Sequence, residues 1–171
     1  LAGWRRLRIV PVGVGAPVLG AVGVSGLNPA GLSAAFGNVA ASRVTRSGYV
    51  YQLWLPAATA GGVTGAIAEA AAGGATAGAF PDPDNGEILW ACYAWPMNSG
   101  QTGNRAFCVN QEGDLLQTRN QGAVATGPYN GAITVPAFDA AYSGAADMAS
   151  QLSISGAPAA AQDANLWVPV Q

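Results

Sequence analysis

The abundance of glycine and proline is the feature that most limits what this chain can fold into. Of its 171 residues, 24 are glycine and 11 are proline, and both residue types weaken or interrupt helices. Half of the residues are hydrophobic but only 8% are aromatic, so the apolar content is largely alanine and valine. This composition suits thin sheets and long loops better than a thick helical core.

Four segments have the alternation or the aromatic and β-branched content of strands. In the segment 48–55 (GYVYQLWL), Tyr49, Tyr51, Leu53 and Leu55 share one face. The loop 96–104 and then a very short turn join the other three segments, which predict an antiparallel meander. These three segments are 88–95, 105–111 and 114–119.

The remaining sequence is dominated by glycine, alanine and proline, and we predict one domain over residues 1–171. The domain comprises a Gly/Pro-rich arm (1–29), an Ala/Gly-rich loop insertion (57–86) and a C-terminal segment (120–171). The predicted fold class is α+β and mainly antiparallel β, a sheet meander with one or two short helices and long Gly/Ala-rich loops. Short helices are expected at 30–41, at 65–72, where a surface loop is the alternative, and at 138–143 or 145–152; strand-like pieces are expected at 132–136 and 166–170.

The charged residues argue against several classes of function. All seven basic residues are arginine, and the chain has no lysine and no histidine. The commonest general base, the commonest metal ligand and Schiff-base chemistry are therefore missing, and we expect a protein that is not an enzyme. A net charge of −2 also argues against a nucleic-acid partner, because binding phosphates requires a clustered basic face.

The most apolar stretch is 9–27 (IVPVGVGAPVLGAVGVSGL), which follows the basic string RRLR. Its two prolines and five glycines interrupt any helix, so we expect no membrane span here. Basic residues followed by an apolar run are also the pattern of a signal peptide. An extended arm or an edge strand agrees better with the proline and glycine content.

The two cysteines, Cys92 and Cys108, lie on neighbouring predicted strands. If the connecting loop is centred on Gly100, the two residues face each other directly, at a separation that a disulfide accepts. A disulfide would indicate an oxidising, extracytoplasmic setting. Two buried free thiols are the alternative, because a shift of one residue in register would separate the pair.

The turn PDPDNGE offers a second set of candidate ligands. Asp82, Asp84, Asn85 and Glu87 could supply oxygen atoms to calcium, although the later ligands of a calcium loop are missing. Ordinary turn chemistry is the alternative, with Asp and Asn bonding to the local backbone and Gly86 at positive φ. No other cofactor or metal site is expected.

Glu112 and Asp114 are the best carboxylate pair for a hydrolase that works with carboxylates alone. They flank Gly113 in a segment that we interpret as a hairpin turn over 110–113, with Gly113 in the left-handed conformation. Carboxylates in such turns are normally solvated, so catalysis is the weaker interpretation.

The segments 43–56 and 87–118 together resemble the globular part of bacterial type IV pilin-like and pseudopilin-like proteins. The family has a strand with the pattern SGY, followed by a hairpin that ends in a V-N-Q-x-G turn. The matching positions are Ser47-Gly48-Tyr49, Tyr93-Ala94-Trp95-Pro96, Gly103-Asn104-Arg105, Phe107, Val109-Asn110-Gln111 and Gly113.

The resemblance implies a sheet packed against a helix, and a structural subunit of an extracellular or cell-surface filament. Such proteins assemble through a long apolar N-terminal helix, which this sequence does not contain. Three interpretations stay open: the chain is a processed or incomplete head, it pairs with a separate helical subunit, or it polymerises by another route, such as an N-terminal arm that adds a strand to a neighbour's sheet.

The alternative hypothesis is an extracellular binding module for glycan or peptide. In that hypothesis Trp54, Trp90, Trp95 and the tyrosines line a groove. Core and cross-strand packing is the competing explanation for these aromatic residues, because they lie within predicted strands.

Overall fold

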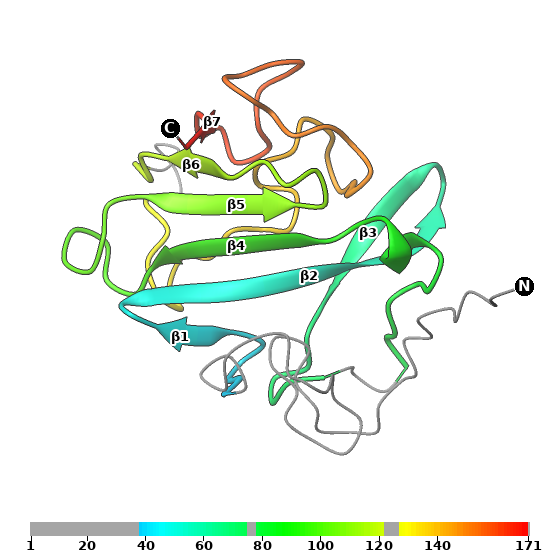
Figure 1. Ribbon diagram of the computed structural model, residues 1–171, viewed down its shortest axis with the longest axis horizontal. Helices are drawn as coiled ribbons and strands as arrows, with labels where there is room; N and C mark the ends of the chain where they lie inside the picture. Colours follow the sequence, from blue (N-terminus) through cyan, green and yellow to red (C-terminus); the bar gives the residue numbers. More distant parts are fainter. Residues whose placement is uncertain (1–37, 75–77, 122–126, 171) are drawn as a thin grey trace, which may run out of the picture.

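A single antiparallel sheet of seven strands organises the protein (Figure 1). The computed structural model describes residues 38–74, 78–121 and 127–170. The order across the sheet is β1-β2-β4-β5-β6-β7, and β3 also pairs with β2. The strands are β1 (Val44–Arg46), β2 (Tyr49–Ala60), β3 (Val63–Ala68), β4 (Ala91–Pro96), β5 (Ala106–Asn110), β6 (Leu116–Thr118) and β7 (Val168–Pro169).

The long strand β2 carries two hairpins on the same edge. Trp54 pairs with Ala91 of β4 on one side and with Ala68 of β3 on the other, so β3 lies on the side of β2 that β1 also occupies. Each hairpin has a two-residue loop, Ser47-Gly48 or Gly61-Gly62, and all four residues have positive φ. Such loops match the natural twist of paired strands.

The predicted meander is confirmed, and several details differ. β2, β4, β5 and β6 overlap the four predicted strand segments, and β7 lies within 166–170. β2 continues to Ala60, so the insertion predicted at 57–86 begins as a hairpin rather than as a loop. In place of a strand, 132–136 contributes only a bridge between Asn130 and Thr134.

The predicted helices are wrong where the structure describes their residues. Residues 65–68 of the segment 65–72 belong to β3, because the Gly61-Gly62 turn pairs them with β2 and this pairing overrides the helix preference of alanine. The segments 138–143 and 145–152 form turns, in which Ser143 N–H bonds to Gln151 O rather than to a helical partner. Among the described residues the only helical element is one 3₁₀ turn, η2 (Asn85–Glu87). Most of the helix predicted at 30–41, and the arm at 1–29, lie outside the described residues.

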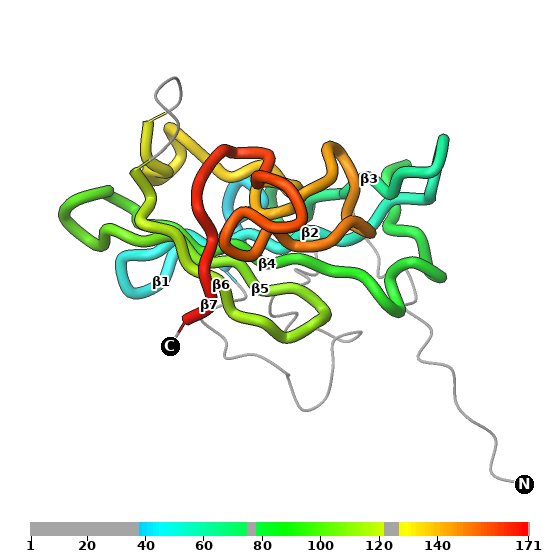
Figure 2. The backbone as a smooth tube through the Cα atoms, turned by 90° about the horizontal axis from the view of Figure 1, so that it is seen from above, coloured from blue at the N-terminus to red at the C-terminus, as the bar shows by residue number. Residues whose placement is uncertain are grey.

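The core lies between the sheet and the C-terminal segment, which crosses one face of the sheet in Figure 2. Every second residue of β4 points into this layer, where Ala91, Tyr93 and Trp95 are buried. The Tyr93 hydroxyl donates to Phe138 O at 2.9 Å and accepts from Ala141 N–H at 3.1 Å. Specific polar contacts therefore hold the irregular C-terminal layer in place.

A second set of contacts fixes the C-terminal layer to the end of β4. Trp95 Nε1 donates to Gly131 O at 2.8 Å, and Gly131 N–H donates to Pro96 O at 2.9 Å. Gly131 has φ +50°, and a Cβ built on it would lie 2.7 Å from Met97 O. Only glycine permits this approach without strain.

Candidate functional site

The face of the sheet opposite the C-terminal layer is the strongest candidate for a functional surface. In antiparallel sheets such a face is normally polar, whereas here the alternate positions of β2, β4 and β5 are apolar or aromatic. All of its residues are uncharged and half-buried. We call this surface the outer face, and it consists of Tyr49, Tyr51, Leu53, Leu55, Ile67, Cys92, Ala94, Phe107 and Val109.

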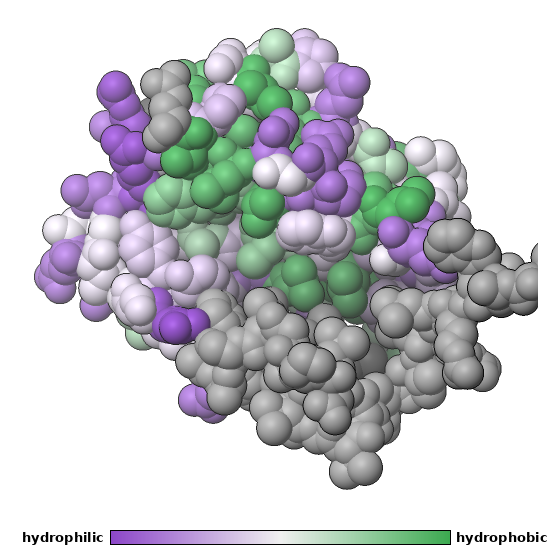
Figure 3. Space-filling view, in the orientation of Figure 1, coloured by the Kyte–Doolittle hydropathy of each residue, from purple (hydrophilic) through white to green (hydrophobic). Residues whose placement is uncertain are grey.

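Figure 3 looks onto this side of the molecule and shows apolar surface gathered over the central strands. The apolar area continues beyond the strands to Leu115, which is 45% exposed. A contiguous apolar surface bordered by polar residues commonly marks an interaction site.

The strand register explains a groove that runs along the outer face. Ala94 of β4 pairs with Tyr51 on one side and with Phe107 on the other. Cys92 lies in the same way between Leu53 and Val109. Small side chains on β4 therefore form the floor, and large side chains on β2 and β5 form the walls. The hollow has a volume of about 430 Å³, within the range of ligand-binding clefts.

Tyr49 extends one wall of this groove. Its ring lies 5.9 Å from that of Phe107, at an interplanar angle of 49°. A Cβ on Gly103 would lie 2.2 Å from the Tyr49 hydroxyl oxygen. The loop after β4 therefore packs closely against the Tyr49 ring. Burial raises the pKa of Tyr49, and the neighbouring Tyr51 raises it further. The phenol therefore stays neutral at physiological pH.

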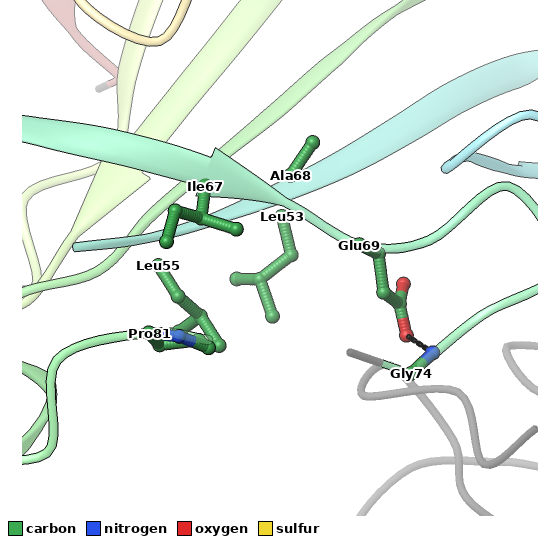
Figure 4. Close-up of a pocket in the computed structure, with 7 residues that line it drawn as sticks. All are labelled: Leu53, Leu55, Ile67, Ala68, Glu69, Gly74 and Pro81. Atoms are coloured by element: carbon green, nitrogen blue, oxygen red, sulfur yellow. Dashed lines mark hydrogen bonds between the residues drawn. The ribbon is translucent and has the colours of Figure 1, made fainter. Parts of the chain in front are cut away.

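A second, smaller hollow lies at the other end of the outer face. In Figure 4 the side chains of Leu53, Leu55 and Ile67 converge with Pro81. The cavity measures about 20 Å³, which is room for about one water molecule. Beside it, Glu69 Oε1 accepts a hydrogen bond from Gly74 N–H at 3.2 Å and closes the loop after β3. This end is filled by its own side chains and continues the apolar surface.

The predicted disulfide between Cys92 and Cys108 does not form. Cys92 pairs with Val109, and Cys108 pairs with Tyr93, so the connecting loop is centred between Gly100 and Gln101 rather than on Gly100. This one-residue difference places the thiols on opposite faces of the sheet, and both are free. Cys92 lies in the floor of the groove, whereas Cys108 lies in the core.

Neither thiol is activated for chemistry. Burial raises the pKa of Cys92 to about 11, and burial raises the pKa of Cys108 still further. Both side chains are therefore protonated at neutral pH, and protonated thiols are poor nucleophiles and poor metal ligands.

The four candidate calcium ligands differ in their contacts and in their exposure to solvent. Asp82 Oδ1 accepts from Asn85 N–H at 2.8 Å and from Asp84 N–H at 3.1 Å, and Asn85 Nδ2 donates to Ala57 O at 2.9 Å. Asp84 and Glu87 are exposed, and within the described part of the chain no three acidic, cysteine or histidine side chains converge on a metal position. Turn formation is thus the role that the structure gives Asp82 and Asn85, although Gly86 does not have the positive φ predicted for it. Calcium binding stays a prediction.

The turn at 110–113 has the predicted form. Gly113 has φ +83°, its N–H bonds to Asn110 O at 3.0 Å, and Glu112 N–H bonds to Asn110 Oδ1 at 3.1 Å. Glu112 and Asp114 are both exposed.

The aromatic residues of the groove agree in part with those that the sequence suggested. Tyr49 and Tyr51 line it, together with Phe107, which the sequence did not suggest. Trp95 is fully buried, and Trp54 packs on the core side, with its ring 6.0 Å from that of Phe138. The groove residues alternate with the buried residues of β2 and β5, and only the register shows that Tyr51 and Phe107 lie on either side of Ala94.

Comparison of the chain with family models, with curated proteins and with solved structures finds no match in any of the three. The resemblance to pilin-like proteins accordingly stays a prediction. A search of the described residues finds no helix long and apolar enough to cross a membrane.

Proposed function

We propose that this protein is a non-catalytic structural subunit that self-associates into a cell-surface filament or tube, and that the outer face is its contact surface. The observation that carries the proposal is that nine uncharged, mostly apolar side chains occupy positions where an isolated sheet would present polar ones. Identical subunits offer the simplest partner, and a contact between this face and a different surface of the neighbouring copy repeats without closing.

The free energy gained by burying the outer face is close to the free energy lost on association. Burying the remaining exposed area of a half-buried apolar side chain contributes about 1 kcal/mol, so the nine residues together contribute on the order of 10 kcal/mol. The loss of translational and rotational freedom on association costs about 4 to 15 kcal/mol. The outer face alone therefore supports weak association, and a stable polymer requires an additional contact.

Electron microscopy of the full chain at high concentration tests the proposal. We expect filaments or tubes from the wild-type protein. Val109→Lys places a charge in the groove wall and should abolish them, whereas Ile133→Lys alters an 86% exposed residue of the C-terminal segment and should not. Circular dichroism and thermal unfolding would verify that both variants fold. Filaments of unchanged abundance from Val109→Lys would contradict the proposal.

A glycan or peptide ligand for the groove is the second candidate function. It is favoured by the aromatic walls formed by Tyr49, Tyr51 and Phe107, since aromatic side chains suit both kinds of ligand. Binding on a glycan or peptide array that Tyr51→Ala removes, in a protein that remains monomeric, would favour this function over self-association.

A further inference from the structure

We propose that the groove of the outer face receives the segment 9–27 from a neighbouring copy of the chain. The inference rests on the proposed function, and it identifies the part of the neighbouring copy that covers the outer face. A contact between two different surfaces of identical subunits does not close on itself, so it repeats along a filament.

The sequence of this segment has the period of an extended chain. Within 9–27 the even-numbered positions 10, 12, 14, 18, 22 and 24 are all valine, and most of the intervening positions are glycine or proline. In an extended chain alternate side chains point the same way, so six valines would lie on one side. Pro11 and Pro17 cannot donate backbone hydrogen bonds to a central position in a sheet. The segment therefore suits docking through its side chains.

The groove has the width for a short stretch of extended chain. Its walls stand on β2 and β5, whose backbones are two strand spacings apart, or about 10 Å. The rings of Tyr49 and Phe107 meet at one end, with their centroids 5.9 Å apart, so the groove is open at the other end. This is also about the distance at which two layers of strands pack face to face. Because Cys92 and Ala94 form a low floor, valine side chains entering between the walls would meet apolar atoms on three sides.

The distribution of charge favours the same pairing. Residues 1–37 contain three arginines and no acidic residue, whereas the remaining residues contain four arginines and nine acidic residues. The two parts therefore carry net charges of +3 and −5, and they attract each other at moderate ionic strength.

The charges also suggest which way the segment runs. Leu115 is among the residues that line the groove, and it directly follows the turn that carries Glu112 and Asp114, both of which are exposed. The basic string RRLR directly precedes Ile9. A segment that starts at the Leu115 end of the groove would place these arginines beside the two carboxylates.

The chain is long enough for this contact. The segment ends at Leu27, and the described residues begin at Asn38, next to β1 at the edge of the sheet. The intervening ten residues reach up to about 33 Å when extended. That reach allows the segment to leave its own subunit.

Cys92 provides a native probe in the groove floor. We would introduce Val14→Cys into the full chain, oxidise the protein at alkaline pH with copper phenanthroline, and map the disulfides by mass spectrometry. We expect a disulfide between position 14 of one chain and Cys92 of another, at about ten times the yield obtained with Ile133→Cys, because docking raises the local concentration. Adding Val109→Lys should remove this excess.

The outcomes separate the inference from the proposed function. A disulfide formed within one chain would show that the segment binds its own subunit, which overturns the contact between copies. No excess over the Ile133→Cys control would overturn the groove as the docking site of the segment. Filaments that persist in that case would leave the proposed function standing, whereas absence of both filaments and cross-links would remove both proposals.

Discussion

At the scale of single residues, Asp163 is the side chain on which the C-terminal layer most depends. Its carboxylate accepts from Tyr129 Oη at 2.5 Å, from the backbone and side-chain N–H groups of Asn165 at 2.9 Å, and from Trp167 Nε1 at 3.2 Å. Trp167 is fully buried and packs edge-on against Tyr93, with the ring centroids 6.0 Å apart. One carboxylate therefore links the last strand to the core.

Replacing this carboxylate should destabilise the fold. Asp163→Asn keeps the size of the side chain but turns an amide N–H toward groups that themselves donate. We expect the free energy of unfolding, measured by urea denaturation, to fall by about 2 to 4 kcal/mol. The matched control Asp114→Asn alters an exposed turn carboxylate and should change stability by less than about 0.5 kcal/mol. Equal effects of the two substitutions would contradict the role assigned to Asp163.

The thiol of Cys92 should make stability depend on pH in the alkaline range. Folding raises its pKa from an ordinary value of 9.0 to about 11, so the folded protein holds this proton more tightly than the unfolded chain. The stabilisation is complete below pH 9 and is lost as the pH rises toward 11.

This contribution can be isolated by comparing the wild-type protein with Cys92→Ala. Urea denaturation between pH 8 and about pH 11 should show the stability advantage of the wild type shrinking, by at most about 1 kcal/mol per pH unit. A difference between the two proteins that is independent of pH would show that the environment of Cys92 does not shift its pKa.

At the scale of elements, two glycines with positive φ have different roles and offer a matched comparison. Gly61 lies in the β2–β3 hairpin loop with nothing near its missing side chain, whereas Gly131 lies against Met97 O. Gly61→Ala should reduce the free energy of unfolding by about 1 kcal/mol through backbone strain alone. Gly131→Ala adds a clash between the C-terminal layer and β4, and should cost about 3 kcal/mol. Equal losses in thermal or urea unfolding would show that the close approach at Gly131 contributes nothing.

The elements also differ in how well they can be predicted from the sequence. Alternation is strong in β2, β4 and β5, where buried and half-buried residues follow one another, so the meander is predictable. The β2–β3 hairpin is hidden in an Ala/Gly stretch that lacks apolar alternation, and its only local signal is Gly61-Gly62. The C-terminal layer has no periodic pattern, since contacts such as Trp95 to Gly131 hold it rather than a backbone ladder.

The residue types of the candidate site can be predicted from the sequence, but their spatial arrangement cannot. The composition of the outer face is visible in the segment 48–55, where Tyr49, Tyr51, Leu53 and Leu55 alternate with other residues. The groove depends on which residues of β5 stand opposite Cys92 and Ala94, and a shift of one residue exchanges the two faces of a strand. The length of the loop between β4 and β5 sets that register. A loop centred on Gly100 would pair Cys92 with Cys108, whereas Cys92 pairs with Val109.

At the scale of the whole molecule, the sheet is covered by the C-terminal layer on one face and presents an uncharged groove on the other. The charges divide in a complementary way between the N-terminal 37 residues and the rest of the chain. These features support a subunit that assembles with its own kind, in which the groove and the segment 9–27 act as the two halves of one contact.

Salt should weaken this assembly without abolishing it. The arginines of the N-terminal segment and the acidic residues beside the groove attract each other through solvent, and salt screens that attraction. Light scattering of the full chain should therefore show a smaller average mass in about 0.5 M salt than in about 0.05 M salt, with an apolar contribution that persists. An average mass that rises with salt would indicate that the apolar face alone drives association.

The most direct test of the central claim is the average mass of the full chain, measured by sedimentation equilibrium over a wide concentration series. The wild-type protein and Ile133→Lys should both grow from monomer to large species as concentration rises. Val109→Lys should require at least about tenfold higher concentration to do so, which corresponds to a loss of about 1.4 kcal/mol per contact. A wild-type chain that remains monomeric throughout, or a Val109→Lys variant that associates like the wild type, would contradict the assignment of the outer face as the self-association surface.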